Sequence, residues 1–194
     1  DMVGQILPGY DFISDASVSY DHPLPHTSAN DRDDNATDPG DWVQAGGCGG
    51  GIPYKDTPSS WHGSHVAGTI AAIANNSKGI VGLAYKAKIL PVRVLGTCGG
   101  YDSDIIDGIV WAAGGSVPGV TNNPNTAKII NLSLVGPEAS CPSAYQQAID
   151  TARNLGAVVV VAAGNSNINA AGFTPANCEG VITVEEARGT ETEV

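Results

Sequence analysis

The sequence has few charged residues and very few basic ones. Only 15% of its 194 residues are charged, and 20 acidic residues stand against 9 Lys and Arg, which gives a net charge of -11. Nucleic-acid binding depends on clustered basic side chains that neutralise phosphates. The composition therefore excludes nucleic acid as a partner, and it suits a calcium ion or a basic protein better.

Long apolar runs are also absent. No stretch approaches the roughly 20 apolar residues that a membrane-spanning helix needs. The N-terminal DMVGQILPGY has no signal-peptide character. We therefore expect no membrane as a partner.

Close cysteine pairs are the third absence. Zinc sites usually contain C-x-x-C pairs, whereas the four cysteines here are widely spaced: Cys48, Cys98, Cys141 and Cys178. Two disulfides formed in an oxidising compartment are the favoured interpretation, and four buried free thiols in a cytosolic protein are the alternative. Three pairings are possible, and the residues alone do not select one.

Glycine, proline and apolar residues are plentiful. With 42% hydrophobic residues, 25 glycines and 12 prolines, the chain suits one domain with a sizeable core and many turns. Apolar β-rich runs alternate with helix-patterned segments, which predicts an α/β fold of three layers with a mainly parallel sheet and helices on both faces. The predicted strands are 9–13, 88–95, 127–134, 157–163 and 180–184, and the predicted helices are 103–115 and 143–156.

The predicted helix 143–156 carries signals at both of its ends. Ser143 has the position of an N-cap, and Gln146 completes a capping box. Gly156 is the expected stop.

Polar and glycine-rich segments follow two of the predicted strands. The run 127–134 continues into 133–136, and the run 157–163 continues into 164–167. Functional residues of a parallel sheet gather at the carboxyl ends of its strands. A third segment, SSWHGSHVAGTIAAIANNS, predicts a helix that begins at His62. We expect the start of this helix and the carboxyl ends of the two strands to face a common crevice.

Three interpretations fit the pair His62 and His65 at the start of that helix. Zinc ligation is weakly supported, because the spacing is i, i+3 and no Glu accompanies it. The second interpretation has both rings buried and hydrogen-bonded in the core. The third makes one ring a general base at a helix N-terminus, where the dipole disfavours positive charge and so suits a ring that accepts a proton. The spacing alone does not decide among them.

Together with three later motifs, this segment resembles the subtilisin-like serine proteases. HGSHVAGTIAA is similar to the family's histidine motif H-G-T-H-V-A-G-T, and NNSKGIVGLAYKAKILPVRVL, NLSL and VVVVAAGNSN follow in the family's order. The secreted bacterial members with cysteines and acidic loops are the most similar. The resemblance covers most of residues 60–184. It implies a three-layer α/β fold, a secreted protein that is monomeric when complete, and endopeptidase activity through Asp, His and Ser on an extended polypeptide substrate.

The resemblance also assigns roles to single residues. It implies that His62 is the general base, that His65 is a structural partner one turn on, and that Asn165 donates to the oxyanion of the transition state. A turn residue at a strand end is the other interpretation of Asn165. Pro175 is similar to the family's cis-proline.

The same resemblance implies that an extended substrate peptide hydrogen-bonds between two strands of the protein. It also implies a pocket for the substrate residue before the scissile bond. The first strand is Gly99, Gly100 and Tyr101, the second is Ser133, Leu134 and Val135, and the pocket is lined by Gly164 and Phe173. Val135 stands where the family usually has glycine, so this edge departs from the pattern. We expect Gly136 to supply the backbone freedom that a glycine at position 135 would have given.

Two segments are candidate sites for structural calcium. The stretch NDRDDNATDPGD, residues 30–41, is crowded with oxygen ligands, and a solvated acidic loop is the alternative interpretation. Its predicted ligands are Asp31, Asp34, Asp38 and Asp41. The resemblance implies a second site at Asp1 and Asn76 with nearby backbone carbonyls, and it implies the disulfides Cys48–Cys98 and Cys141–Cys178.

Two of the family's motifs are absent. The sequence has no G-T-S-x-A motif for the nucleophile, and DM resembles the end of the segment that follows the catalytic Asp. We therefore expect residues 1–194 to be a single incomplete catalytic domain, truncated at both ends, with an atypical tail at 185–194. Such a chain is expected to be marginally folded and inactive alone, because a histidine and an oxyanion donor without a serine hydroxyl have no covalent route to cleavage. The alternative function is a non-catalytic peptide-binding module or pseudoenzyme that uses the same strands.

Overall fold

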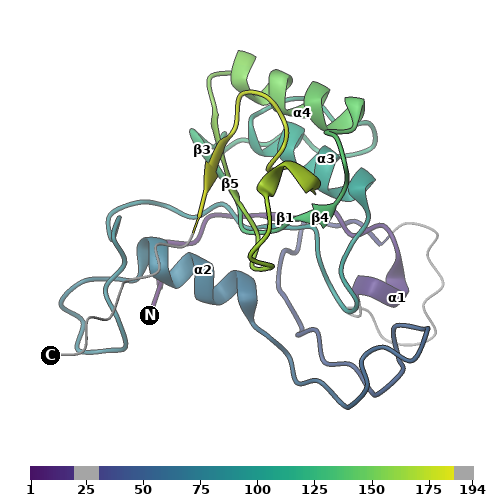
Figure 1. Ribbon diagram of the computed structural model, residues 1–194. Coiled ribbons are helices and arrows are strands. Elements are labelled where there is room, and N and C mark those ends of the chain that lie inside the picture. The colour runs from purple at the N-terminus through teal and green to yellow at the C-terminus, as the bar shows by residue number, and fades with distance from the viewer. Residues whose placement is uncertain (20–30, 186–194) are drawn as a thin grey trace, which may run out of the picture. The chain divides into compact units, whose positions relative to one another are not determined.

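A computed structural model describes residues 1–19 and 31–185, and it divides the chain into two compact units (Figure 1). The first unit is Asp1–Gly108 and the second is Ile109–Val194. The expectation of a single domain stays a prediction.

The first unit is built on a short pair of parallel strands. β1 (Tyr10–Asp11) pairs with β2 (Val92–Arg93), with Tyr10 opposite Val92. β2 is much shorter than the predicted strand 88–95, because Pro91 has no N–H to donate to the ladder. The pairing resumes before Pro91 as a single parallel bridge between Ile6 and Ile89.

Three helices begin in the first unit. These are α1 (Ala16–Ser19), α2 (His62–Ala71) and α3 (Asp102–Ala112). α2 begins at His62, as predicted. Its C-terminal end is held by a following segment, whose N–H groups at Gly82, Leu83 and Ala84 donate to carbonyls of residues 72, 69 and 70.

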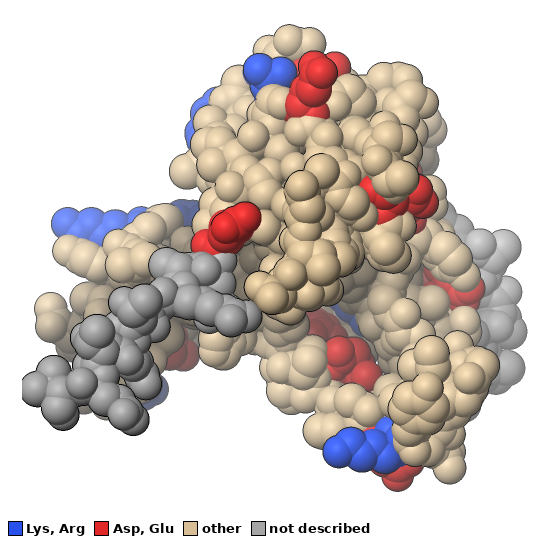
Figure 2. All heavy atoms as spheres, viewed as in Figure 1, with Lys and Arg blue, Asp and Glu red and all other residues tan. Residues whose placement is uncertain are grey.

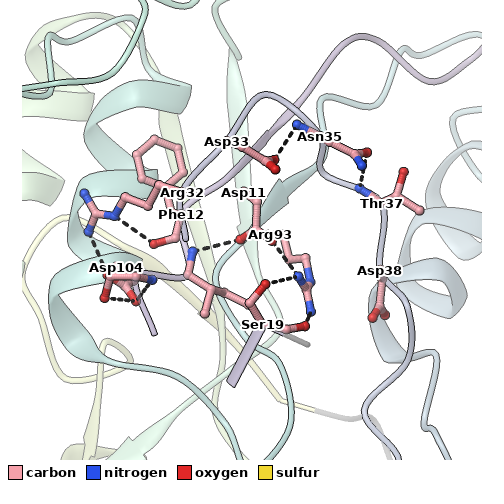
Figure 3. A network of polar contacts seen from close by, with 12 residues as sticks. Asp11, Phe12, Ser19, Arg32, Asp33, Asn35, Thr37, Asp38, Arg93 and Asp104 are labelled. Atoms are coloured by element: carbon pink, nitrogen blue, oxygen red, sulfur yellow. Dashed lines mark hydrogen bonds and ion pairs between the residues drawn. The ribbon is translucent and has the colours of Figure 1, made fainter. Parts of the chain in front are cut away.

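Two arginines, the buried Arg93 and the partly buried Arg32, organise the polar interior of the first unit (Figure 3). Arg93 on β2 donates to the carboxylate of Asp11 on β1, whose side chain is fully buried, and to the hydroxyl and carbonyl of Ser19 at the end of α1. Arg32 donates to Asp104 and Asp107 on α3 at 2.6 and 2.7 Å. Buried charges are tolerated in this way because each is paired and hydrogen-bonded.

The second unit is built on three parallel strands in the order β3-β5-β7. They are β3 (Ile129–Leu132), β5 (Val158–Ala162) and β7 (Ile182–Val184). The helix α4 (Ser143–Asn154) packs against β5 and buries Tyr145, Ala148, Ile149 and Ala152. Val159 and Val161 of β5 are almost completely buried. The predicted parallel pairing of these apolar runs is confirmed.

The predicted capping box of α4 is wrong. Ser143 is the first helical residue, and the N-cap position belongs to Pro142, which has no side chain able to cap. Gln146 instead reaches a different segment, where its side chain accepts from the N–H of Glu179 and donates to that residue's carbonyl. Pro142 occupies the N-cap position with φ -61°, the value that its ring favours, and the helix starts without a side-chain cap. Gly156 follows the helix with φ 88°, which confirms the predicted stop.

A short antiparallel pair completes the second unit. β4 (Gly136–Pro137) pairs with β6 (Phe173–Thr174), and the 3-10 helix η1 (Ala170–Gly172) leads into β6. The peptide bond before Pro175 is cis, as the resemblance implied, and the bond before Pro53 is cis as well.

All four cysteines are paired, in the two disulfides that the resemblance implied. Cys48–Cys98 lies in the first unit with a Cα–Cα distance of 5.5 Å, and Cys141–Cys178 lies in the second with 4.9 Å. Both partners of the first disulfide are exposed, whereas Cys178 is buried.

The surface carries few charges. Figure 2 shows isolated acidic and basic side chains on a face that consists mostly of uncharged residues. Within the described residues, every helix is too short or too polar to cross a membrane.

Candidate active site

His62 is the first residue of α2 and is exposed. The preceding residue, Trp61, has a left-handed backbone with φ 51°, which turns the chain sharply into the helix. His65 lies one turn further on and is also exposed. The interpretation of two buried core histidines is therefore wrong.

The start of α2 is held by a chain of hydrogen bonds from the acidic loop. Asp41 accepts from the backbone N–H and the hydroxyl of Ser60, at 2.5 and 2.8 Å. The Ser60 hydroxyl oxygen in turn accepts from the N–H of His62 at 3.3 Å. Because the first N–H groups of a helix have no intrahelical acceptor, this bond satisfies one of them and fixes the residue that carries the imidazole.

The segment 99–101 is not a strand in the structure. Gly96 and Gly99 form a single bridge around a tight turn, and Gly100 and Tyr101 then lead directly into α3. A side chain at Gly100 would place its Cβ 2.2 Å from the carbonyl oxygen of Val94, so only glycine fits there. Gly99 has φ 110°, so the segment begins in a turn. Pairing of 99–101 with a substrate peptide stays a prediction.

Tyr101 is held at its hydroxyl end. Its hydroxyl donates to a carboxylate oxygen of Asp15 at 3.0 Å, while its side chain stays half exposed. This hydrogen bond is the main reason that the pKa of Tyr101 is raised. The pKa of Asp15 is lowered, first by the hydroxyl of Ser17, then by the Ser17 N–H and by Tyr101.

The second predicted substrate-binding segment, 133–135, links β3 to β4 without regular structure. Val135 lies against Gly164, since a Cβ at Gly164 would be 3.3 Å from a methyl carbon of Val135. Gly164 has φ 95°, a conformation that disfavours any other residue. The unusual valine and this glycine therefore fit together, and the structure brings these two predicted site residues into contact.

Asn165 and Phe173 belong to the same unit as this contact. Asn165 is exposed and follows Gly164 just beyond the end of β5. Phe173 is the first residue of β6 and pairs with Pro137 of β4. The strand pair β4-β6 therefore connects the segment that follows β3 with the segment that follows β5. That His62 shares a crevice with these residues stays a prediction.

The acidic loop uses its carboxylates within the protein. Asp38 accepts from the N–H of Gly40, Asp41 is bound to Ser60, and Asp31 is buried, whereas Asp34 is exposed. Across residues 1–19 and 31–185, no three His, Cys, Asp or Glu side chains lie close enough together to hold a metal ion. Calcium in this loop stays a prediction, and Asn30 lies outside the described residues.

Asp1 and Asn76, the second predicted calcium pair, do lie together. The amide of Asn76 donates to the carboxylate of Asp1, and the N–H of Ile73 donates to the carbonyl of Asp1 at 3.1 Å. The other carboxylate oxygen is next to Gly79, 2.8 Å from where a Cβ would stand. The amide oxygen of Asn76 accepts from the N–H of Lys78, so the amide group presents its nitrogen to Asp1. Asp1 and Asn76 therefore lie together, and calcium bound there stays a prediction.

Two features of the candidate site were not predicted from the sequence. One is the link from Asp41 through Ser60 to His62, and the other is the link from Asp15 to Tyr101. Ser60 lies one residue before the N-cap Trp61 and accepts from an N–H two residues further on, a local hydrogen bond that serine often makes, so the first link had a local signal. The second joins residues 86 apart in the sequence and had none.

Comparisons with known proteins match the motif order and the fold. The Subtilase family (Peptidase_S8) matches residues 13–193. The extracellular protease of Xanthomonas campestris pv. campestris is 54% identical over 184 residues, which are 95% of this chain and 30% of that protein. The extracellular basic protease of Dichelobacter nodosus is 49% identical over 189 residues, again 95% of this chain and 30% of that protein.

Solved structures of similar proteins agree with this family assignment. One of proteases from Pseudoalteromonas arctica PAMC 21717 is 54% identical with a TM-score of 0.84, and the match covers 92% of this chain and 50% of that chain. Sphericase is 26% identical with a TM-score of 0.62, over 94% and 47% of the two chains.

The fold and the order of the motifs define a subtilisin-like α/β protein, which confirms the predicted fold class. The chain belongs to the Subtilase family. It spans 30% of the length of the two curated relatives and 50% of the first solved structure.

Proposed function

We propose that this chain supplies the general base, the oxyanion donor and the peptide-binding segments of a secreted serine endopeptidase. The observation that carries the proposal is membership of the Subtilase family over residues 13–193, a range that includes His62 and Asn165. Two positions support the assigned roles: His62 opens α2, and Asn165 follows the carboxyl end of β5.

In the proposed reaction, the imidazole of His62 accepts the proton of a serine hydroxyl as its oxygen bonds to the peptide carbonyl carbon. The side-chain amide of Asn165 donates to the oxyanion that forms, and His62 then passes the proton to the departing amine. The motif of the nucleophilic serine is not present in these 194 residues, and neither is that of the catalytic Asp. The proposed activity therefore needs a further polypeptide segment that carries both.

The proposed substrate is a polypeptide in extended conformation. It would lie between the segments 99–101 and 133–135 and hydrogen-bond to their backbones, with Gly164 and Phe173 at the pocket before the scissile bond. Both segments lie outside the helices and regular strands, which leaves their backbones able to pair with a peptide.

Secretion, a monomeric complete protein and structural calcium are parts of the same proposal. Two disulfides and the extracellular relatives support secretion. The contact of Asp1 with Asn76 and with the loop 73–81 supports calcium there, where the ion would hold the loop and take no part in the chemistry. Calcium at Asp31, Asp34, Asp38 and Asp41 has weaker support.

Complementation tests the proposed function. The chain would be produced alone, and also joined to the flanking segments of the Xanthomonas campestris relative that carry the Asp and Ser motifs. Hydrolysis of fluorescein-labelled casein would be measured for both. We expect no hydrolysis by the chain alone and clear hydrolysis by the joined protein.

Three variants of the joined protein then test the roles. His62→Ala should abolish hydrolysis, and Asn165→Ala should lower kcat by about 10²- to 10³-fold, because one oxyanion donor is lost. Asn154→Ala, which alters an exposed Asn at the end of α4, should leave the rate unchanged. Binding of casein without hydrolysis by a well-folded joined protein would favour the peptide-binding module instead.

A further inference from the structure

The segment Ser14–Ser19, which includes α1, contacts the predicted substrate-binding segment 99–101 and the residues that flank it. On one side of 99–101, the N–H of Thr97 donates to the carbonyl of Val18 at 2.9 Å. On the other side, the N–H and hydroxyl of Ser14 donate to a carboxylate oxygen of Asp104 on α3, at 2.9 and 3.1 Å. The segment 99–101 is therefore anchored at both of its ends to the same short stretch of chain.

Asp15 makes the contact between these two anchors. One of its carboxylate oxygens accepts from the Tyr101 hydroxyl at 3.0 Å. The other accepts from the N–H and the hydroxyl of Ser17, at 2.8 and 2.7 Å. The carboxylate is thus fixed in direction before it meets the tyrosine.

The backbone of Tyr101 is fixed independently of Asp15. Its carbonyl accepts from the N–H groups of Asp104 and Ile105 in the first turn of α3. The torsions of the side chain are then the freedom that remains, and a half-exposed tyrosine ring would otherwise sample several rotamers. The hydrogen bond to Asp15 restrains that freedom while about half of Tyr101 stays exposed to solvent.

We infer that Asp15 is a positioning residue for peptide binding, which holds the ring of Tyr101 so that an apolar side chain of the substrate packs on its exposed face. This role rests on the proposed function, because it takes the segment 99–101 as one edge of the peptide groove. A ring that is already ordered loses little conformational entropy when the peptide binds, so Asp15 raises affinity without touching the peptide. Aromatic rings supply large contact areas for such packing.

Peptide affinity measured on the full chain tests the inference. The probe is a fluorescein-labelled eight-residue peptide of alternating Ala and Phe, and its binding is followed by fluorescence anisotropy well below the melting temperature of every variant. We expect Asp15→Ala and Tyr101→Phe each to weaken binding by about three- to tenfold, the factor that one net hydrogen bond provides. The double variant should bind as the weaker single variant does, because both changes remove the same bond.

Conservative variants separate positioning from loss of structure. Asp15→Asn keeps an acceptor oxygen for the Tyr101 hydroxyl, so it should restore most of the affinity that Asp15→Ala loses. Asp102→Asn removes a carboxylate next to Tyr101, and Tyr54→Phe removes the hydroxyl of an exposed tyrosine in the same unit. Both should bind as the unmodified chain does.

The outcomes distinguish this inference from the proposed function. If the unmodified chain binds the peptide and Asp15→Ala and Tyr101→Phe bind it equally well, the role of Asp15 is overturned and the groove stands. If the unmodified chain does not bind the peptide at all, the groove and the role of Asp15 are both overturned. If Asp15→Ala unfolds, the comparison of Tyr101→Phe with Asp15→Asn decides.

Discussion

The two units of the chain are stabilised by different interactions. Asp1–Gly108 contains two-residue strands and short helices, and its interior is organised by paired charges around Arg93 and Arg32. Ile109–Val194 contains a three-stranded parallel sheet with an amphipathic helix packed on it by its apolar face. The residues in its centre, such as Ile149 and Val159, are aliphatic and fully buried.

This contrast follows from the sequence of each unit. The second unit has β-branched runs such as VVVVA, which form strands and fill a core with few special contacts. The first unit has long glycine-rich and acidic stretches that cannot bury much apolar surface, so its fold depends on particular polar partners. One expects the first unit to be sensitive to single polar substitutions and the second to lost volume.

The largest effect is expected from Arg93→Ala. The substitution leaves the fully buried carboxylate of Asp11 without its cation, and removing one partner of a buried pair costs about 3–5 kcal/mol. Hydrogen exchange followed by mass spectrometry should show much faster exchange in β1 and β2 than in β3 and β5.

Ile149→Ala is the matched variant in the second unit. It removes a fully buried aliphatic side chain of α4 and should cost about 2–5 kcal/mol, with the faster exchange now in β5. The exposed pair Arg153–Asp150, with a 3.7 Å separation, provides a control, because Asp150→Ala should change stability by less than about 1 kcal/mol. Equal acceleration of both units by Arg93→Ala would show that the contrast between them is not real.

Loss of a disulfide is expected to have the next largest effect on stability, and the two disulfides also allow the two units to be compared. They close loops with sequence separations of 50 and 37, so loss of either should cost about 2–4 kcal/mol. Access to reductant should differ, since both sulfurs of Cys48–Cys98 belong to exposed residues and Cys178 is buried. On titration with a phosphine reductant, alkylation and mass spectrometry should detect free Cys48 and Cys98 first. Simultaneous release of all four thiols would contradict this order.

The smallest effect is expected at the start of α2. Ser60→Ala removes the acceptor of the His62 N–H and the hydroxyl that binds Asp41, which should cost about 1 kcal/mol of stability. Thermal melting measures the loss, and exchange at the first N–H groups of α2 should rise. Ser64→Ala, at an exposed position within the same helix, is the control and should have almost no effect. An equal loss in the two variants would argue against the cap.

Much of the second unit was predictable from the sequence. Its strands are continuous apolar runs, and Gly156 ends α4 as expected. The error at Ser143 arose because a capping box and a proline before a helix compete for the same place, and the sequence pattern does not rank them. The start of α2 at His62 was predictable because the family motif includes it.

The polar interior of the first unit was not predictable in the same way. No local pattern marks Arg32, although its guanidinium neutralises two carboxylates of α3 that lie more than 70 residues away in the sequence. Burial alone would lower the pKa of Arg32, but hydrogen bonds to Asp104 and Asp107 outweigh it and raise the pKa. Long-range pairs of this kind have no local pattern, which is why the acidic loop was interpreted only as a calcium site or as a solvated loop.

The disulfides also determine what a cut in the backbone would do. Cys48 and Cys98 enclose α2 and His62 in a covalently closed ring, and Cys141 and Cys178 enclose β5 and Asn165 in another. A single break of the backbone inside either ring leaves both ends of the chain tethered. In surroundings rich in proteolytic enzymes, the two segments that carry the proposed chemistry can therefore be nicked without being shed.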